Sequence, residues 1–191
     1  MAYKPPVAVY DACVLYPFHL RNLLIQCAVD RLVQARWTDE IHEEWIRSLA
    51  ANTSGLTEER LRRTRDLMRS VLPDADVRGH HALTPQIALP DPRDRHVVAA
   101  AIAGGASIVV TWNLADFPPS ILTKHHLTAQ DPDVFMMGLH AAAPDVVVAS
   151  AANARRNLRT SAPTQHEFLD VLERQGLRQF VAQLRPHASK L

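Results

Sequence analysis

The stretch VAVYDACVLYP, residues 7–17, decides how the rest of the chain is interpreted. Its four apolar residues predict a short buried strand over 7–10. Asp11 then stands directly before a second apolar run, where an unpartnered buried carboxylate would cost several kcal/mol. A helix cap or a turn is one explanation for this acid. A metal ligand at the carboxyl end of a first strand is the other.

The composition predicts a soluble, globular protein. The chain has 191 residues, of which 47% are hydrophobic and 21% charged, so it can bury a substantial core. Its apolar runs fall short of the ~20 residues that span a bilayer, and MAYKPP has no signal-peptide pattern. Cys13 and Cys27 lie in apolar surroundings, which favours free thiols over a disulfide. We therefore expect a cytoplasmic protein without a membrane segment.

Helical and strand patterns alternate over the first two thirds of the chain. Helices are predicted over 20–33, from the N-cap Thr38 to 49, from Thr57 to Pro73, and over 94–106. Gly104 and Gly105 end the last of these, and SIVVT (107–111) reads as a second buried strand. Short connections between such elements are typical of an α/β fold with a mostly parallel sheet flanked by helices.

The remaining segments are less regular or wholly helical. Residues 77–92 are predicted to be irregular, with short extended pieces, and everything from about residue 131 reads as helical. We therefore expect a domain over 1–130 and a helical C-terminal extension over 131–191. The extension is amphipathic and could complete the core, form a dimer surface or hold another protein.

Four acids stand where an α/β sheet can bring them together. Asp11 and Asp116 follow the two strands, Asp94 lies at a helix entrance beside Asp91, and Glu44 lies on the helix after Thr38. Such a cluster requires cations to neutralise it. Oxygen ligands favour Mg²⁺ or Mn²⁺, ions that commonly act on phosphate groups.

Taken singly, each acid has a plainer explanation. Asp94 could be only a helix N-cap, Asp116 a turn residue, and Glu44 an exposed helix acid. Helical spacing turns Glu44 towards the sheet and Glu43 about 100° away from it. Asp91 is interpreted as a cap or a supporting acid. Only the combination indicates a metal site.

That combination resembles the PIN domain, a Mg²⁺-dependent ribonuclease fold, and within it the VapC-like toxins of bacterial toxin–antitoxin pairs. The matching pieces are VYDACVLYP, RWTDEIHEEWIRSL, LPDPRDRHVVAAAIAGGASIVVTWN and NLADFP, which cover roughly residues 7–118 in this order. Together they are specific, although each alone would be weak.

The resemblance implies a hydrolase that cuts RNA phosphodiester bonds with Mg²⁺ or Mn²⁺. Carried over, the catalytic and metal-binding acids are Asp11, Glu44, Asp94 and Asp116. Thr111 and Asn113 match positions that support the last acid or a metal-bound water. The resemblance also implies a cognate antitoxin, and we expect a homodimer.

Arginines could bind the substrate. Arg62, Arg65 and Arg69 share one helix face by their spacing, and we interpret them as phosphate contacts. The alternative, a solvated helix surface or an antitoxin-docking face, stays open. Arg47, one turn beyond Glu44, could instead orient the acids.

Other classes of protein fit less well. An aspartate-nucleophile phosphatase needs a second Asp where this chain has Cys13, and a receiver domain needs a paired early acid and a late Lys. The histidines, His80, His81 and His96 among them, lack a closed zinc-binding spacing and are interpreted as solvated loop residues. A DNA nuclease with the same site and a non-catalytic PIN-like binding module remain as alternatives.

Overall fold

The computed structural model describes residues 3–191 and centres on a four-stranded sheet. The strand order is β2-β1-β3-β4, and every neighbouring pair is parallel. The strands are β1 (Val7–Tyr10), β2 (Gln34–Arg36), β3 (Ile108–Val110) and β4 (Thr128–Gln130). In the central register, Ala8 of β1 lies opposite Ala35 on one side and Ile108 on the other. The predicted α/β class with a parallel sheet is confirmed.

Helices surround this sheet and form the whole C-terminal part of the chain. The α-helices are α1 (Ala12–Leu15), α2 (Phe18–Val29), α3 (Asp39–Asn52), α4 (Glu58–Val71), α5 (Arg95–Ala103), α6 (Pro119–Leu122), α7 (Pro132–Ala142), α8 (Pro144–Arg156), α9 (Gln165–Arg174) and α10 (Arg178–Leu184). The 3₁₀ turns are η1 (Pro73–Ala75), η2 (His80–Ala82), η3 (Thr84–Gln86), η4 (Pro92–Asp94), η5 (Leu114–Asp116), η6 (Thr123–His125) and η7 (Arg185–Lys190).

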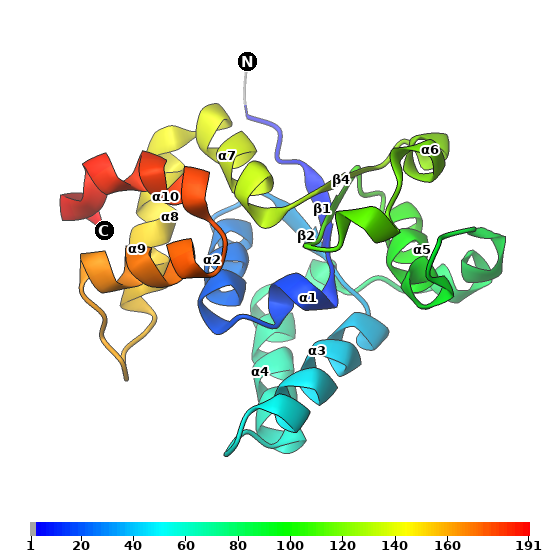
Figure 1. Cartoon of the computed structure of the whole chain (residues 1–191), viewed down its shortest axis with the longest axis horizontal. Helices are drawn as coiled ribbons and strands as arrows, with labels where there is room; N and C mark the ends of the chain where they lie inside the picture. Colours follow the sequence, from blue (N-terminus) through cyan, green and yellow to red (C-terminus); the bar gives the residue numbers. More distant parts are fainter. Residues whose placement is uncertain (1–2) are drawn as a thin grey trace.

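The helices fall into three groups around the sheet (Figure 1). Helices α3 and α4 lie below the sheet in this view, α5 and α6 lie to its right, and α7 to α10 lie to its left with α2. Within the left group, α8 packs on α2, and α10 packs on α7 and α9. The predicted helical C-terminal extension is therefore present. Its separation as a domain of its own at residues 130 and 131 stays a prediction.

Local signals explain why the elements near the candidate acids form. The Thr38 hydroxyl caps α3 by accepting from the Ile41 amide at 3.3 Å, and Thr57 caps α4 in the same way. Helix α5 is rich in small residues, and its stretch 97–101 is fully buried against β1 and β3. Because α5 runs back along the sheet, its N-terminus lies at the carboxyl edge of the strands.

Two features differ from the expectations. Strands β2 and β4 were not predicted, because each is only three residues long and carries polar residues at its ends. Segment 77–92 holds the 3₁₀ turns η2 and η3 and the first residue of η4, and it contains no strand. The extended pairing near it is one bridge between Trp37 and Asp76. Over residues 3–191, none of the helices is long and apolar enough to span a membrane.

Candidate functional site

Three of the four sequence-predicted acids line one cavity. Asp11 follows β1, Glu44 lies on α3, and Asp94 immediately precedes α5. The cavity has a volume of about 470 Å³, and Asn113, from the loop after β3, also lines it. The carboxyl ends of parallel strands are the usual place for such a site. Segments more than 80 residues apart in sequence thus meet at this edge of the sheet.

Asp11 is held in one orientation by several donors. Its Oδ1 accepts from the Ala12 amide at 2.7 Å, so Asp11 caps α1. Its Oδ2 accepts from Thr111 Oγ1 at 2.7 Å and from Cys13 Sγ at 3.2 Å. Burial, with the nearby Asp11 charge, raises the pKa of Cys13 to about 12, so the thiol keeps its proton and remains a donor. The side chain is both a cap and a wall of the cavity.

The raised pKa of Asp94 indicates that it lies in a crowded acidic site. It occupies the N-cap position of α5, but its side chain makes no capping hydrogen bond. Burial, followed by the charges of Asp11, Asp91, Asp116 and Glu44, raises its pKa from 3.8 to about 6. A capping role alone therefore does not account for this carboxylate.

The other acids and the predicted supporting residues lie around the three acids that line the cavity. Asp116 ends η5 and acts on Asp94 through its charge, although it does not line the cavity. Asp91 caps η4 by accepting from the Arg93 amide at 2.9 Å, and it pairs with the Arg93 guanidinium at 2.7 Å. The Asn113 amide donates to Thr111 Oγ1 at 3.0 Å, so the Thr111 hydroxyl links the loop after β3 to Asp11.

The two adjacent glutamates of α3 point to different neighbours. Glu44 Oε1 lies 2.9 Å from His96 Nε2, whereas Glu43 pairs with Arg62 and Arg65 of α4, each at 3.0 Å. Burial opposes the protonation of His96, but contact with Glu44 and nearby acids outweighs it and raises the pKa of this imidazole. The interpretation of His96 as a solvated loop residue is wrong, because it lies on α5 and is only 7% exposed. Its position two residues after Asp94 was the available signal.

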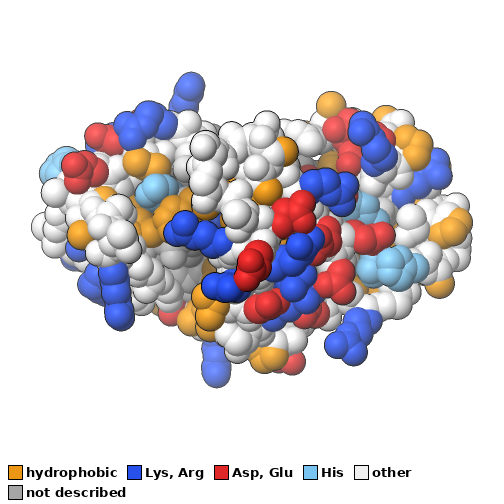
Figure 2. All heavy atoms as spheres, turned by 90° about the horizontal axis from the view of Figure 1, so that it is seen from below, with side chains coloured by type: hydrophobic (Ala, Val, Ile, Leu, Met, Phe, Trp, Pro, Cys, Tyr) orange, Lys and Arg blue, Asp and Glu red, His pale blue; other side chains and the backbone are white. Residues whose placement is uncertain are grey.

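The arginines predicted to contact phosphate are already paired with acids. Arg62 also contacts Glu58 at 2.8 Å, and Arg69 contacts Asp39 and, at 3.0 Å, Asp76. Figure 2 shows this mixture of basic and acidic side chains across the middle of the face seen from below. These pairs favour the helix-surface alternative, and phosphate binding by the arginines stays a prediction. Arg47 is exposed, and its charge acts on Glu43.

Asp11, Glu44, Asp94 and Asp116 form an acidic centre. This centre fits a hard divalent ion that is held through few direct ligands. Its donors are all carboxylate oxygens, which suit Mg²⁺ or Mn²⁺. Across residues 3–191, no three of these acids bring their oxygens within 4.8 Å of one another. Mg²⁺ commonly takes one or two carboxylates directly and keeps several waters, so this spacing is compatible with it.

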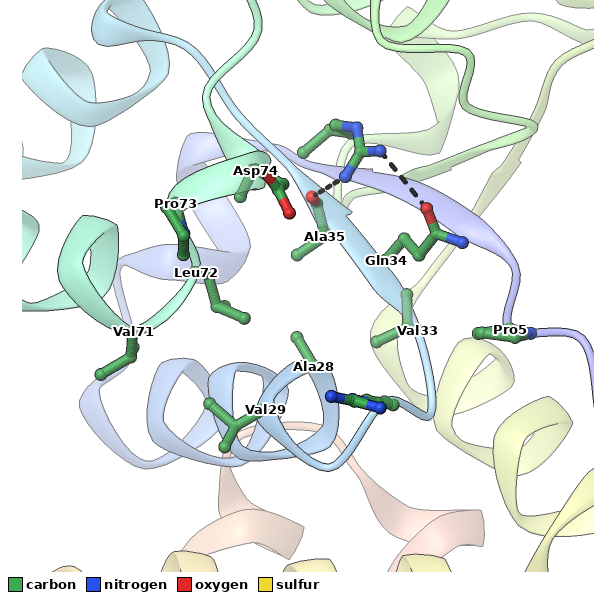
Figure 3. Close-up of a pocket in the computed structure, with 13 residues that line it drawn as sticks. Pro5, Ala28, Val29, Val33, Gln34, Ala35, Val71, Leu72, Pro73 and Asp74 are labelled. Carbon is green, nitrogen blue, oxygen red and sulfur yellow. Dashed lines mark hydrogen bonds between the residues drawn. The ribbon is translucent and has the colours of Figure 1, made fainter.

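A larger cavity, of about 660 Å³, lies beside β2 and contains none of the candidate acids (Figure 3). It is bounded by the end of α2, by β2 and by residues 71–75. The Arg36 guanidinium there is occupied by the Ala35 carbonyl at 2.8 Å and by Gln34 Oε1 at 3.4 Å. Volume alone would select this cavity, but the chemistry favours the smaller, acid-lined one.

Comparisons with known proteins show similarity in both parts of the chain. A family model described as the PIN domain matches residues 7–115, and one described as the VapC50 C-terminal domain matches residues 132–186. A protein of Mycobacterium tuberculosis (strain ATCC 25618 / H37Rv), named "Putative ribonuclease VapC50", is 35% identical over 96 residues. The match covers 49% of this chain and 54% of that protein, so the chain spans about half the length of this curated relative. No solved structure matches the chain.

Proposed function

This chain belongs to the PIN domain family and resembles VapC proteins, and on that premise we propose that it is a metal-dependent endoribonuclease. The observation that carries the proposal is the convergence of Asp11, Glu44 and Asp94 on one cavity, with Asp116 within electrostatic reach. The ribonuclease name of the mycobacterial relative supports RNA as the substrate.

In this proposal the acids hold the ion, and other side chains position one of the acids. Asp11, Glu44, Asp94 and Asp116 would hold Mg²⁺ or Mn²⁺, an ion that activates water and neutralises charge on phosphate when bound. Thr111 and Cys13 fix the Asp11 carboxylate, so its orientation is set before any ligand arrives. The raised pKa of Asp94 means that burial and the neighbouring acids disfavour its charged form, and a bound cation would offset that negative charge.

We further propose that the protein is the toxin of a toxin–antitoxin pair, with a cognate antitoxin as its partner. The match of residues 132–186 to the VapC50 C-terminal domain and the name of the relative support this role. A homodimer and a cytoplasmic location are part of the same proposal. Phosphate contact by Arg62, Arg65 and Arg69 requires phosphate to compete with the acids they now touch. RNA binding through these arginines would weaken as salt rises, because contacts with phosphate release counterions.

The deciding experiment uses the two neighbouring glutamates as a matched pair. Purified wild type, Glu44→Gln and Glu43→Gln are incubated with single-stranded RNA and with DNA of the same sequence, in Mg²⁺ or Mn²⁺. We expect wild type and Glu43→Gln to cut RNA and Glu44→Gln to be at least about 100-fold slower, because only Glu44 lines the cavity. Growth arrest on expression should follow the same order.

Each other outcome selects a different function. Cleavage of DNA with RNA left intact would identify a DNA nuclease of the same fold. Failure of wild type to cut either nucleic acid, with no growth arrest, would favour a non-catalytic binding module. Equal loss in both variants would mean that α3 was disturbed as a whole, and a melting curve for each variant separates that case.

A further inference from the structure

We propose that Glu40, His80 and His81 form a second metal site, which takes a divalent transition ion such as Zn²⁺ and is distinct from the acidic centre. Glu40 lies in the first turn of α3, and the two histidines open η2, 40 residues later. One ligand atom from each of the three lies within 4.8 Å of the other two. In the part of the chain that the structure describes, this is the sole group of three that meets this spacing.

The distances between the Glu40 oxygens and the ring nitrogens of the two histidines are close to those of a metal site, so only small shifts of these side chains would be needed to bind an ion. Glu40 Oε2 lies 2.7 Å from His80 Nε2, and Glu40 Oε1 lies 3.9 Å from His81 Nδ1. Ligands at about 2.0–2.1 Å around a tetrahedral ion stand about 3.4 Å from one another. Each distance differs from that value by less than 1 Å, and each involves a different oxygen of the carboxylate. The carboxylate therefore faces both rings at nearly the required spacing.

The local backbone and burial hold the first histidine in place. Gly79, with φ of 77°, turns the chain immediately before His80, and η2 packs on α5. His80 is only 4% exposed, and its Nδ1 has no hydrogen-bond partner among residues 3–191. The His81 ring lies against it, with ring centroids 4.1 Å apart and ring planes tilted by 35°. Both rings thus lie next to the Glu40 carboxylate.

The donor set separates this site from the neighbouring acids. Two imidazoles and one carboxylate suit zinc and similar ions, whereas the oxygen-only centre suits Mg²⁺. The exposed side chain of His81, 73% accessible, leaves an open side through which an ion and water can enter. Histidine side chains lie beside acidic ones on the face shown in Figure 2. Three protein ligands leave at least one coordination position for solvent.

The test measures Zn²⁺ binding by calorimetry in millimolar Mg²⁺, on the full chain carrying Asp11→Asn and Asp116→Asn so that the acidic centre is disabled. We expect one equivalent of Zn²⁺, with the affinity lowered at least about tenfold by His81→Gln and by Glu40→Gln. His166→Gln, an exposed histidine on α9, is the matched control and should bind as its parent does.

Either of two results would overturn the site. If the parent takes up no Zn²⁺, Glu40 and His80 form only a hydrogen bond. If His81→Gln and Glu40→Gln both bind as tightly as the control, zinc lies elsewhere. Because His81 is exposed, its replacement should leave the melting temperature unchanged without metal, so loss of folding does not obscure the answer. The readout uses no nuclease activity and is independent of the proposed function.

Discussion

The hydroxyl of Thr111 joins the two central strands by donating to Asp11 Oδ2 at 2.7 Å, at the point where both strands end. Thr111 Oγ1 also accepts a hydrogen bond from the backbone amide of Asn113 at 3.0 Å. Thr111 is fully buried, so these bonds have no water to replace them. A single hydroxyl thus sets both the orientation of the first acid and the path of the loop after β3.

Thr111→Val should therefore damage both the proposed site and the fold. Valine keeps the shape and the strand preference, but leaves Asp11 Oδ2 and the Asn113 amide each short of a partner. We expect a loss of about 1–3 kcal/mol in the free energy of unfolding and a fall in kcat of about tenfold. Thr111→Ser restores the hydroxyl and should recover most of the rate. A valine variant as active as wild type would show that Asp11 needs no such support.

Asp94 should make the stability of the metal-free protein depend on pH. Its pKa is 3.8 in an ordinary setting and about 6 in the folded chain, so folding favours the protonated form. The destabilisation is absent below about pH 4, grows as pH rises through 6, and is complete above it. The full difference corresponds to about 3 kcal/mol, which solvent screening of this half-buried group reduces to about 1 kcal/mol.

Asp94→Asn should remove this pH dependence of stability. The free energy of unfolding is measured in urea at pH 4 and pH 7, in the presence of a chelator. We expect wild type to lose about 1 kcal/mol more than the variant between the two pH values. Equal losses would mean that Asp94 does not experience the neighbouring carboxylates in solution.

The sequence predicted those parts of the fold whose signals are local. The apolar run 7–10, the Thr38 cap and the Gly104 stop each predict an element that the structure contains. Strands β2 and β4 carry no such signal, because their pairing with longer-range partners, rather than their own residues, makes them strands.

The candidate acids could be located because each stands next to a recognisable element, and helical spacing separates Glu44 from Glu43. The histidines could not be placed in the same way. Their partner Glu40 is 40 residues away, and only the packing of η2 beside α3 and α5 brings the rings to that carboxylate. Spacing along the chain therefore says nothing about a site whose ligands come from two separate turns.

The C-terminal extension contacts the loop after β3 through a glycine that cannot be replaced easily. Gly176, between α9 and α10, has φ of 103°, and a Cβ added there would lie 2.6 Å from the Trp112 ring. Gly176→Ala should cost more than about 2 kcal/mol, because it combines backbone strain with a clash. Gly138→Ala is the control. It lies within α7 with open space around it and should stabilise the chain by up to about 1 kcal/mol.

Urea unfolding of both glycine variants measures this difference. Because the Trp112 ring lies against Gly176, the fluorescence of Trp112 in the folded state should also change in Gly176→Ala and stay constant in Gly138→Ala. If both variants prove equally stable, the extension does not depend on this contact with the rest of the chain.

The acids should reveal a shared metal site through the melting temperature. If Asp11, Glu44, Asp94 and Asp116 converge on one ion, Mn²⁺ binds the folded chain only and raises the melting temperature by mass action. An ion at 100 times its dissociation constant would contribute about 2.7 kcal/mol, or about 5–10 °C for a chain of this size. The double variant Asp11→Asn, Asp116→Asn should lose this rise while still folding, since it removes two mutually repelling charges.

Melting curves with and without Mn²⁺ are recorded at fixed ionic strength, so that general screening does not imitate binding. His81→Gln is carried alongside, because any Mn²⁺ held at the histidine site would contribute to the wild-type shift. A rise that survives in the double variant and in the double variant with His81→Gln would mean that neither group of side chains holds the ion.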